Sequence, residues 1–183
     1  YTNRQKLSKN IIMALTKAIL AGWGDHVSKR VRSVEYLAKK RAEGSRTRAV
    51  RYECMSLDED VFLHPSSSLF STSPGWVIYS DIIRTEKRAY MVGLSTIEPQ
   101  WIYSAVPQLT HVSHPLPSPV PRYILQNDCV MAWHEASYGP LQWELPPVLL
   151  PHPDKKERAA LFGMAVLDGT VVPQLKEYSK CFV

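Results

Sequence analysis

Three basic side chains stand together between two stretches that have the composition of β-strands. Arg84, Lys87 and Arg88 follow the apolar pair at 82–83 and precede a β-type run that begins at Tyr90. Guanidinium and ammonium groups on a projecting turn can pair with phosphate oxygens without reading a base sequence. This polar tip is therefore a candidate contact for a nucleic-acid backbone.

A second basic group lies in the first quarter of the chain. Residues 1–51 hold 13 Lys and Arg against 3 Asp and Glu, a net +10, whereas residues 52–183 hold 9 against 14, a net −5. A localised basic block is a reasonable footprint for a polyanion partner, and a solvated helix face is the alternative. We read residues 35–49 as a mobile basic loop, which can bind a phosphate backbone or serve only as a soluble linker. Arg46 and Arg48 in this loop and Arg51 just after it are candidate phosphate contacts.

Aromatic residues lie among these basic ones. Trp76, Tyr79 and Tyr90 occupy β-type runs and are candidates for stacking on bases, although aromatic residues in strands usually pack inward, which favours burial for Trp76. His64 opens a His-Pro-Ser-Ser run. No other metal ligand stands at suitable spacing nearby, so a structural turn is favoured over a metal ligand or a general base.

The stretch 61–103 must position these residues. Apolar and β-branched runs at 61–63, 76–79 and 90–97 are separated by turn-rich segments, and Glu98-Pro99 opens a helix. With a strand over 50–55 before them, these runs predict a small curled antiparallel sheet. The order resembles the oligonucleotide-binding (OB) barrel.

The N-terminal segment predicts helices. An apolar stripe over 4–21 has helical period, and Gly22 and Gly24 end that helix. Asp25 can cap a second helix that carries Val27, Val31 and Val34. The basic residues of the first helix fall largely off its apolar stripe.

The last third returns to strands and then a helix. Residues 113–121 hold four prolines and read as an extended connector. Strands over 122–150 turn at Asn127-Asp128 and Gly139-Pro140, and a helix capped by Asp154 ends at Gly169. We therefore expect an α+β chain with N-terminal helices, an OB-like antiparallel β-barrel and a β-plus-helix extension. The expected division is 1–44 helical segment, 45–112 OB fold and 113–183 C-terminal extension.

Composition narrows the functional classes. A chain of 183 residues with 45% apolar content fits one or two globular domains. It begins at Tyr1 without Met, so we expect it to be part of a longer protein. Three widely spaced cysteines make a zinc site an unfavoured interpretation and suit a reducing compartment. No run of eighteen apolar residues occurs, and no membrane partner is expected.

A series of motifs in this stretch resembles the C-terminal OB-fold region of DEAH-box RNA helicases. The motifs are His64-Pro65-Ser66-Ser67, Pro74-x-Trp76-Val77-x-Tyr79, Tyr90-Met91 and Ile97-x-Pro99-x-Trp101. Ala21-Gly22-Trp23 with Val27-x-x-Arg30 resembles the end of the helical domain that precedes that fold. The long extension after Trp101 resembles the subgroup that acts in small-subunit ribosome biogenesis, and a plant is the suggested source.

The resemblance implies what the chain does and does not do. It implies RNA contact by the region of Ser66, Ser67, Arg84, Lys87 and Arg88. The phosphate-cradling Gly-x-x-x-x-Gly-Lys-Ser/Thr run and the Asp-Glu-x-His box do not occur in this sequence. We therefore expect no ATP hydrolysis and no cofactor here, with ATP and magnesium assigned to motor domains of the parent helicase.

Two functional hypotheses remain open. In the first, the chain binds RNA, with pre-rRNA or snoRNA implied by the resemblance, in the nucleolus of the nucleus. In the second, it is a protein-interaction module that docks a helicase-activating protein of the small-subunit processome and hardly touches RNA. A stand-alone enzyme is a distant third, since no catalytic constellation is visible.

Overall fold

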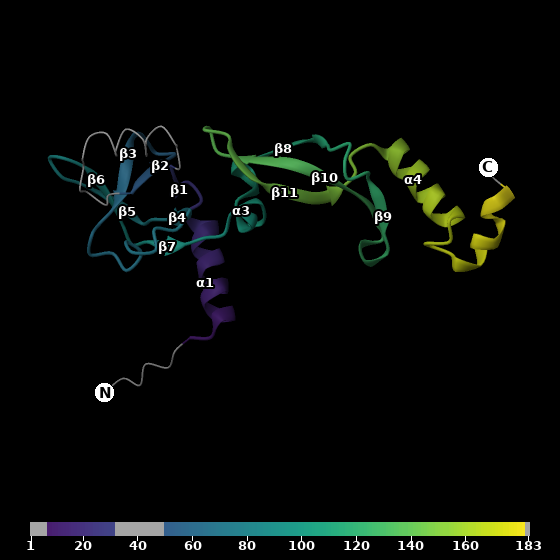
Figure 1. The fold of residues 1–183 in the computed structure, drawn as a ribbon, viewed down its shortest axis with the longest axis horizontal. Helices are drawn as coiled ribbons and strands as arrows, with labels where there is room; N and C mark the ends of the chain where they lie inside the picture. Colours follow the sequence, from purple (N-terminus) through teal and green to yellow (C-terminus); the bar gives the residue numbers. More distant parts are fainter. Residues whose placement is uncertain (1–6, 32–49, 182–183) are drawn as a thin grey trace. The chain divides into compact units, whose positions relative to one another are not determined.

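The computed structural model describes residues 7–31 and 50–181 (Figure 1). The chain divides into two compact units. The first unit comprises Tyr1–Thr110 with Tyr138–Gln142, and the second comprises His111–Ser137 with Trp143–Val183. The three-part division expected from the sequence stays a prediction.

Seven strands form the sheet of the first unit. They are β1 (Val27–Arg30), β2 (Arg51–Cys54), β3 (Leu57–Leu63), β4 (Trp76–Ile78), β5 (Asp81–Arg84), β6 (Ala89–Val92) and β7 (Ser95–Thr96). Their order across the sheet is β5-β6-β3-β2-β1-β4-β7. Neighbours are antiparallel except β3 and β6, which run parallel. The predicted strand starting at 50, the hairpin around 84–88 and the strand at 61–63 are confirmed.

Consecutive strands β4 and β5 pair with different neighbours in the sheet. Only Tyr79 and Ser80 separate β4 from β5, and the Tyr79 N–H donates to the His26 carbonyl at 3.1 Å while the Ser80 N–H donates to the Val92 carbonyl at 3.0 Å. Among the described strands, no pairing joins the outer strands β5 and β7. The predicted α+β class is confirmed, whereas closure into a barrel is not indicated by the pairing.

The core of this sheet is formed by every second side chain along its strands. Tyr52, Val61 and Met91 are 0% exposed and pack in one cluster with Leu63 and Ala89. Alternate positions on β2, β3 and β6 therefore point inward, and the residues between them point outward. The inward positions are mostly apolar, which is why the strands hold this face against the core.

Two helices belong to the first unit. Helix α1 (Lys9–Gly22) begins at Ser8, whose hydroxyl accepts from the Ile11 N–H, and it packs against α3 (Pro99–Ala105). The predicted first helix and the helix opened by Pro99 are confirmed. A short 3-10 helix, η1 (Pro107–Leu109), follows α3.

The predicted second helix is wrong, because its start forms strand β1. Val27 and Ser28 are 0% exposed and pair with β4 on one side and β2 on the other. Burial between two strands overrides the helical spacing of the valines, and β-branched residues fit this environment. Val34 lies outside the described residues.

The second unit holds a smaller sheet and a helix. Its elements are β8 (Thr110–Pro115), β9 (Arg122–Ile124), η2 (Leu125–Asn127), β10 (Cys129–Tyr138), β11 (Trp143–Pro151), α4 (Lys155–Leu167) and η3 (Pro173–Cys181). The strand order is β11-β10-β8, with β9 on β10. The long β10–β11 hairpin is green in Figure 1.

Local signals in the second unit are confirmed with one correction. Asp128 adopts φ 46° in the predicted turn, and Asp154 caps α4 by accepting from the backbone of Lys156 and Glu157. The proline-rich connector is shorter than predicted, because residues 113–115 belong to β8. Strand pairing with β10 satisfies their backbone groups. No helix within 7–31 and 50–181 is long and apolar enough to cross a membrane.

Candidate nucleic-acid interface

One transverse row of side chains crosses four strands of the first unit. The register pairs Arg51 with Phe62, Phe62 with Tyr90, and Tyr90 with Ile83. The residues on both sides of Phe62 along β3, and of Tyr90 along β6, are at most 4% exposed. Side chains alternate between the faces of a strand, so this row faces outward. We call Arg51, Phe62, Tyr90 and Ile83 the outer row.

The aromatic centre of the outer row is bordered by a cation and an imidazole. The Arg88 guanidinium carbon lies 4.8 Å from the centroid of the Phe62 ring. The His64 ring meets Tyr90 edge to face, with centroids 5.3 Å apart. Phe62 and Tyr90 are both half-buried, so their rings keep accessible surface. Adjacent aromatic rings beside an arginine are the composition of a base-stacking site.

The predicted turn at His64 is confirmed. Its Nδ1 accepts from the Ser66 N–H at 3.2 Å and lies 2.6 Å from the Ser66 Oγ, while the Ser67 N–H donates to the His64 carbonyl at 2.9 Å. These bonds close a turn at the surface. Ser66 therefore contacts His64, whose ring in turn contacts the Tyr90 ring. The Ser67 hydroxyl accepts from the Leu69 N–H at 3.2 Å.

The basic tip is an ordered turn. The Thr85 N–H donates to the Arg88 carbonyl at 2.9 Å, and the Arg88 N–H donates to the Thr85 hydroxyl at 3.2 Å. Arg84 lies on the opposite strand face from the outer row, where its Nη2 is 2.8 Å from Glu59 Oε1. Lys87 is exposed and makes no ion pair within the described part of the chain. The tip thus splits its basic groups between two faces.

Acidic residues counter the arginines of this region. Arg51 forms an ion pair through its Nε with Asp60 Oδ1, and both side chains are about one-third exposed. Residues 51–54, 57–63 and 81–92 together carry four basic and six acidic side chains, a net −2. Arg46 and Arg48 lie outside the described residues. The described sheet is therefore not a strongly basic surface.

Trp76, a candidate for stacking, lies elsewhere on the outer face. Trp76 pairs in register with Lys29, whose Nζ is 5.2 Å from the ring centroid. It is half-buried, as is Tyr90. Four strand-to-strand steps separate β4 from β6, about 19 Å along the sheet. Trp76 therefore does not belong to the same aromatic pair as Phe62 and Tyr90.

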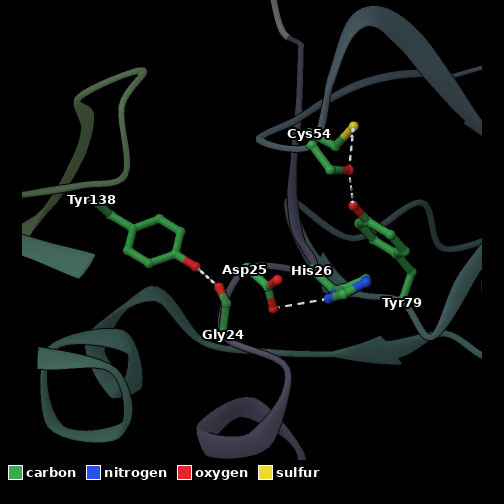
Figure 2. A network of polar contacts seen from close by, with 7 residues as sticks. Gly24, Asp25, His26, Cys54, Tyr79 and Tyr138 are labelled. Atoms are coloured by element: carbon green, nitrogen blue, oxygen red, sulfur yellow. Dashed lines mark hydrogen bonds and ion pairs between the residues drawn. The ribbon is translucent and has the colours of Figure 1, made fainter. Parts of the chain in front are cut away.

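Tyr79 is buried in a polar network and cannot stack on a base (Figure 2). Its hydroxyl is 2.7 Å from Ser56 Oγ, which is 3.7 Å from the Cys54 thiol, and its ring meets His26 edge to face. Burial raises the pKa of Tyr79 to about 12. The hydrogen bond from His26, at 2.9 Å, lowers the pKa of Asp25. Figure 2 also shows Tyr138 donating to the Gly24 carbonyl. This network joins strand ends and is structural.

Sequence reasoning missed Phe62 as a site residue. The signal was the Val61-Phe62-Leu63 run, in which the middle residue of a half-buried strand must face away from its neighbours. Deciding that Phe62 and not its neighbours faces out requires the core to be known. Among the described residues, no group of three His, Cys, Asp or Glu side chains could hold a metal ion.

The second unit also has a concave feature. A groove of about 760 Å³ lies between β9 and α4. Tyr123 and Leu161 line it, and Leu125 and Met164 at its rim are 63% and 64% exposed. Its lining is mostly apolar, with Arg122 and Asp168 as its charged members.

Comparison with known proteins places this geometry in a family. Residues 15–109 match the model of the oligonucleotide/oligosaccharide-binding (OB) fold family. ATP-dependent RNA helicase DEAH13 of Arabidopsis thaliana is 34% identical over 177 residues, which are 97% of this chain and 13% of that protein. Probable ATP-dependent RNA helicase DHX37 of Homo sapiens is 32% identical over 98% of this chain and 15% of its own length.

Probable ATP-dependent RNA helicase kurz of Drosophila melanogaster is 30% identical over 90% of the chain and 14% of its own length. The crystal structure of the E. coli DExH-box NTPase HrpB superposes with a TM-score of 0.41 at 15% identity, over 81% of this chain and 16% of that one. The chain thus spans about one-seventh of the length of these curated relatives. The resemblance seen in the sequence is confirmed: this chain belongs to the OB-fold family found in the C-terminal region of DEAH-box RNA helicases.

Proposed function

We propose that this chain is a non-catalytic, RNA-contacting region of a DEAH-box ATP-dependent RNA helicase. The observation that carries the proposal is the outer row, where Phe62 and Tyr90 lie side by side between Arg88 and His64. OB folds bind single strands through such sheet faces and the loops beside them. The relatives, which are RNA helicases by name, support RNA as the ligand.

In this proposal the bases of a single strand stack on the aromatic pair. Stacking on an aromatic side chain is worth about 1–3 kcal/mol per base. Arg88 adds a cation beside the stacked base, and Lys87 on the turn contacts a neighbouring phosphate. The motor domains of the parent helicase bind ATP and magnesium and move the strand, while this region holds it.

The other predicted RNA contacts take secondary places in the proposal. Ser66 offers a hydroxyl that contacts the His64 ring, which in turn contacts Tyr90, and Ser67 follows it in the His64 turn. Arg51 and Arg84 contribute only after leaving their carboxylate partners. Arg46 and Arg48 contribute backbone contacts through the basic block of residues 1–51, which carries a net +10.

We further propose a role in small-subunit ribosome biogenesis in the nucleolus, with pre-rRNA or snoRNA as the ligand. The long extension after the Trp101 helix supports this, because it resembles that subgroup of the family. A helicase-activating protein of the small-subunit processome would dock on the second unit. The exposed rim residues Leu125 and Met164 of the apolar groove favour that site.

The RNA proposal is tested by fluorescence anisotropy of a labelled single-stranded RNA titrated with the chain. Tyr90→Leu removes one ring of the pair, and we expect the dissociation constant to rise about 5- to 150-fold, the equivalent of 1–3 kcal/mol. Trp76→Leu is the matched control, since Trp76 is also a half-buried aromatic residue on the outer face. We expect a change of less than about twofold for it.

Two outcomes contradict the proposal. Equal weakening by both substitutions would mean that the outer row is not special, and no weakening by Tyr90→Leu would remove it as a contact. Protein docking is tested separately with Leu125→Asp in the full-length helicase. We expect this variant to lose its activating protein, identified by mass spectrometry and then assayed as a purified component, and to keep its RNA affinity.

A further inference from the structure

Three arginines of this part of the sheet are already engaged. Arg51 pairs with Asp60, Arg84 pairs with Glu59 at 2.8 Å, and Arg88 lies over Phe62. The two carboxylates come from adjacent positions of β3, so alternation sends them to opposite faces of the sheet. Strand β3 therefore presents one carboxylate on each face of the sheet, and each carboxylate pairs with a different arginine.

We propose that Glu59 and Asp60 act as internal counter-ions that suppress phosphate binding by this sheet, so that it recognises the bases of unpaired RNA instead of the RNA backbone. The inference rests on the proposed RNA-contacting function and specifies its ligand. It names stacking on Phe62 and Tyr90 as the recognition mode.

Charge arithmetic supports this division. Exposed ion pairs are worth only about 0.2–1 kcal/mol, so the pairs alone do not lock Arg51 or Arg84 in place. A phosphate that reaches either arginine must still approach the carboxylate beside it, and like charges repel. Residues 51–54, 57–63 and 81–92, which surround the outer row, carry a net −2, and with Lys29 and Arg30 of β1 the sheet has no net charge. The sheet therefore gains little from backbone contacts, whereas stacking on an uncharged ring carries no such penalty.

The ligand class follows from the same geometry. A ring half-buried in a sheet can stack only on a base whose face is free. Bases of a duplex are stacked on one another and are not available to Phe62 and Tyr90. The sheet therefore selects single-stranded segments through their bases, independently of how strongly the rest of the chain attracts phosphate.

The experiment compares three RNA probes of equal length: a labelled oligoadenylate, an abasic oligomer with the same number of phosphates, and a duplex. Anisotropy is followed at several salt concentrations. Phosphate contacts elsewhere in the chain affect every variant equally, so differences between variants are decisive. For Tyr90→Leu we expect weaker binding of oligoadenylate, an unchanged salt slope, and affinities for the abasic and duplex probes within about twofold of the wild-type chain.

The counter-ions are tested by Glu59→Gln and Asp60→Asn, each of which removes the negative charge that is paired with one arginine. Each is expected to tighten binding of the abasic oligomer and to steepen the log–log salt slope by about 0.7, the contribution of one phosphate in a single strand. Glu86→Gln is the matched control. Glu86 is an exposed residue of the same turn region and makes no ion pair among the described residues.

The outcomes separate the inference from the proposed function. If Glu59→Gln and Asp60→Asn behave as Glu86→Gln does, or if Tyr90→Leu weakens the abasic and base-containing probes equally, the inference is overturned while RNA binding stands. If the wild-type chain binds no single-stranded probe even at low salt, the proposed RNA contact fails and the inference fails with it.

Discussion

Two buried tyrosines make the first unit sensitive to alkaline pH. Tyr52 is 0% exposed, and its hydroxyl donates to the Pro74 carbonyl at 2.7 Å. Burial raises the pKa of Tyr52 to about 12, and burial likewise raises the pKa of Tyr79 to about 12. An unfolded tyrosine ionises near pH 10. The neutral phenol is thus favoured in the folded state, and its stabilisation is full below pH 10 and lost as pH rises through 12.

Tyr52→Phe tests this reasoning because two effects oppose each other. At pH 8 the variant loses one buried hydrogen bond, and we expect it to be less stable by about 1 kcal/mol. At pH 11, ionisation of Tyr52 in the unfolded state costs the wild-type chain about 1.4 kcal/mol, which the variant avoids. The difference in the free energy of unfolding should therefore vanish or change sign between pH 8 and pH 11.

The assay is urea denaturation followed by far-UV circular dichroism at both pH values. Deprotonation of other groups affects both proteins and cancels in the difference. Ile102→Val is the matched control, because it destabilises a 0% exposed site by about 1 kcal/mol and adds no titratable group. Its difference from the wild-type chain should be the same at both pH values. A constant difference for Tyr52→Phe as well would refute the argument.

Three further predictions concern local structure and use urea denaturation or thermal melting. Asp154→Ala removes the side chain that accepts from the first-turn backbone of α4 and should lower the stability of the chain at pH 7. Because these hydrogen bonds lower the pKa of Asp154, the wild-type advantage should fade as pH falls below about 4. Gly93→Ala should cost more than about 1 kcal/mol, since φ is +62° and an added Cβ would meet Ser80 Oγ at 2.0 Å, whereas Gly22→Ala, with nothing within 4 Å, should be neutral or stabilising. Leu20→Ala should cost about 2–5 kcal/mol, because Leu20 is the buried residue of α1, and a loss below 1 kcal/mol would show that the helix does not depend on it.

Local chemistry made several elements predictable. Pro99 at the first turn of α3, Asp154 at the cap of α4 and Asp128 in the β9–β10 turn each act within a few residues of their own position. A cap or a left-handed turn needs only a particular side chain at a particular place. The structure therefore agrees with the sequence at these points without any knowledge of tertiary contacts.

Pairing between distant segments could not be predicted in the same way. Val27 carries a helical spacing, yet two strands cover it and make it part of a sheet. Phe62 and Tyr90 meet only because β3 and β6 run parallel, and no local pattern sets that register. The pairing of Arg51 with Asp60 depends on the β2–β3 register, so basic residues that looked free in the sequence are countered in the structure.

The separation of charge along the chain gives base stacking a defined role. In the proposed function, the net +10 of residues 1–51 attracts any RNA, whereas residues 51–54, 57–63 and 81–92 carry a net −2 and offer two aromatic rings. A strand held by the basic block meets the sheet at a high effective concentration, so a stacking contact worth only about 1–3 kcal/mol is sufficient to be occupied. Salt weakens the first contact strongly and the second hardly at all. If the sheet were basic as well, it would hold duplex and single strand alike. On this proposal, the acidic residues of β3 sharpen the choice of a single strand, although they add nothing to the total attraction.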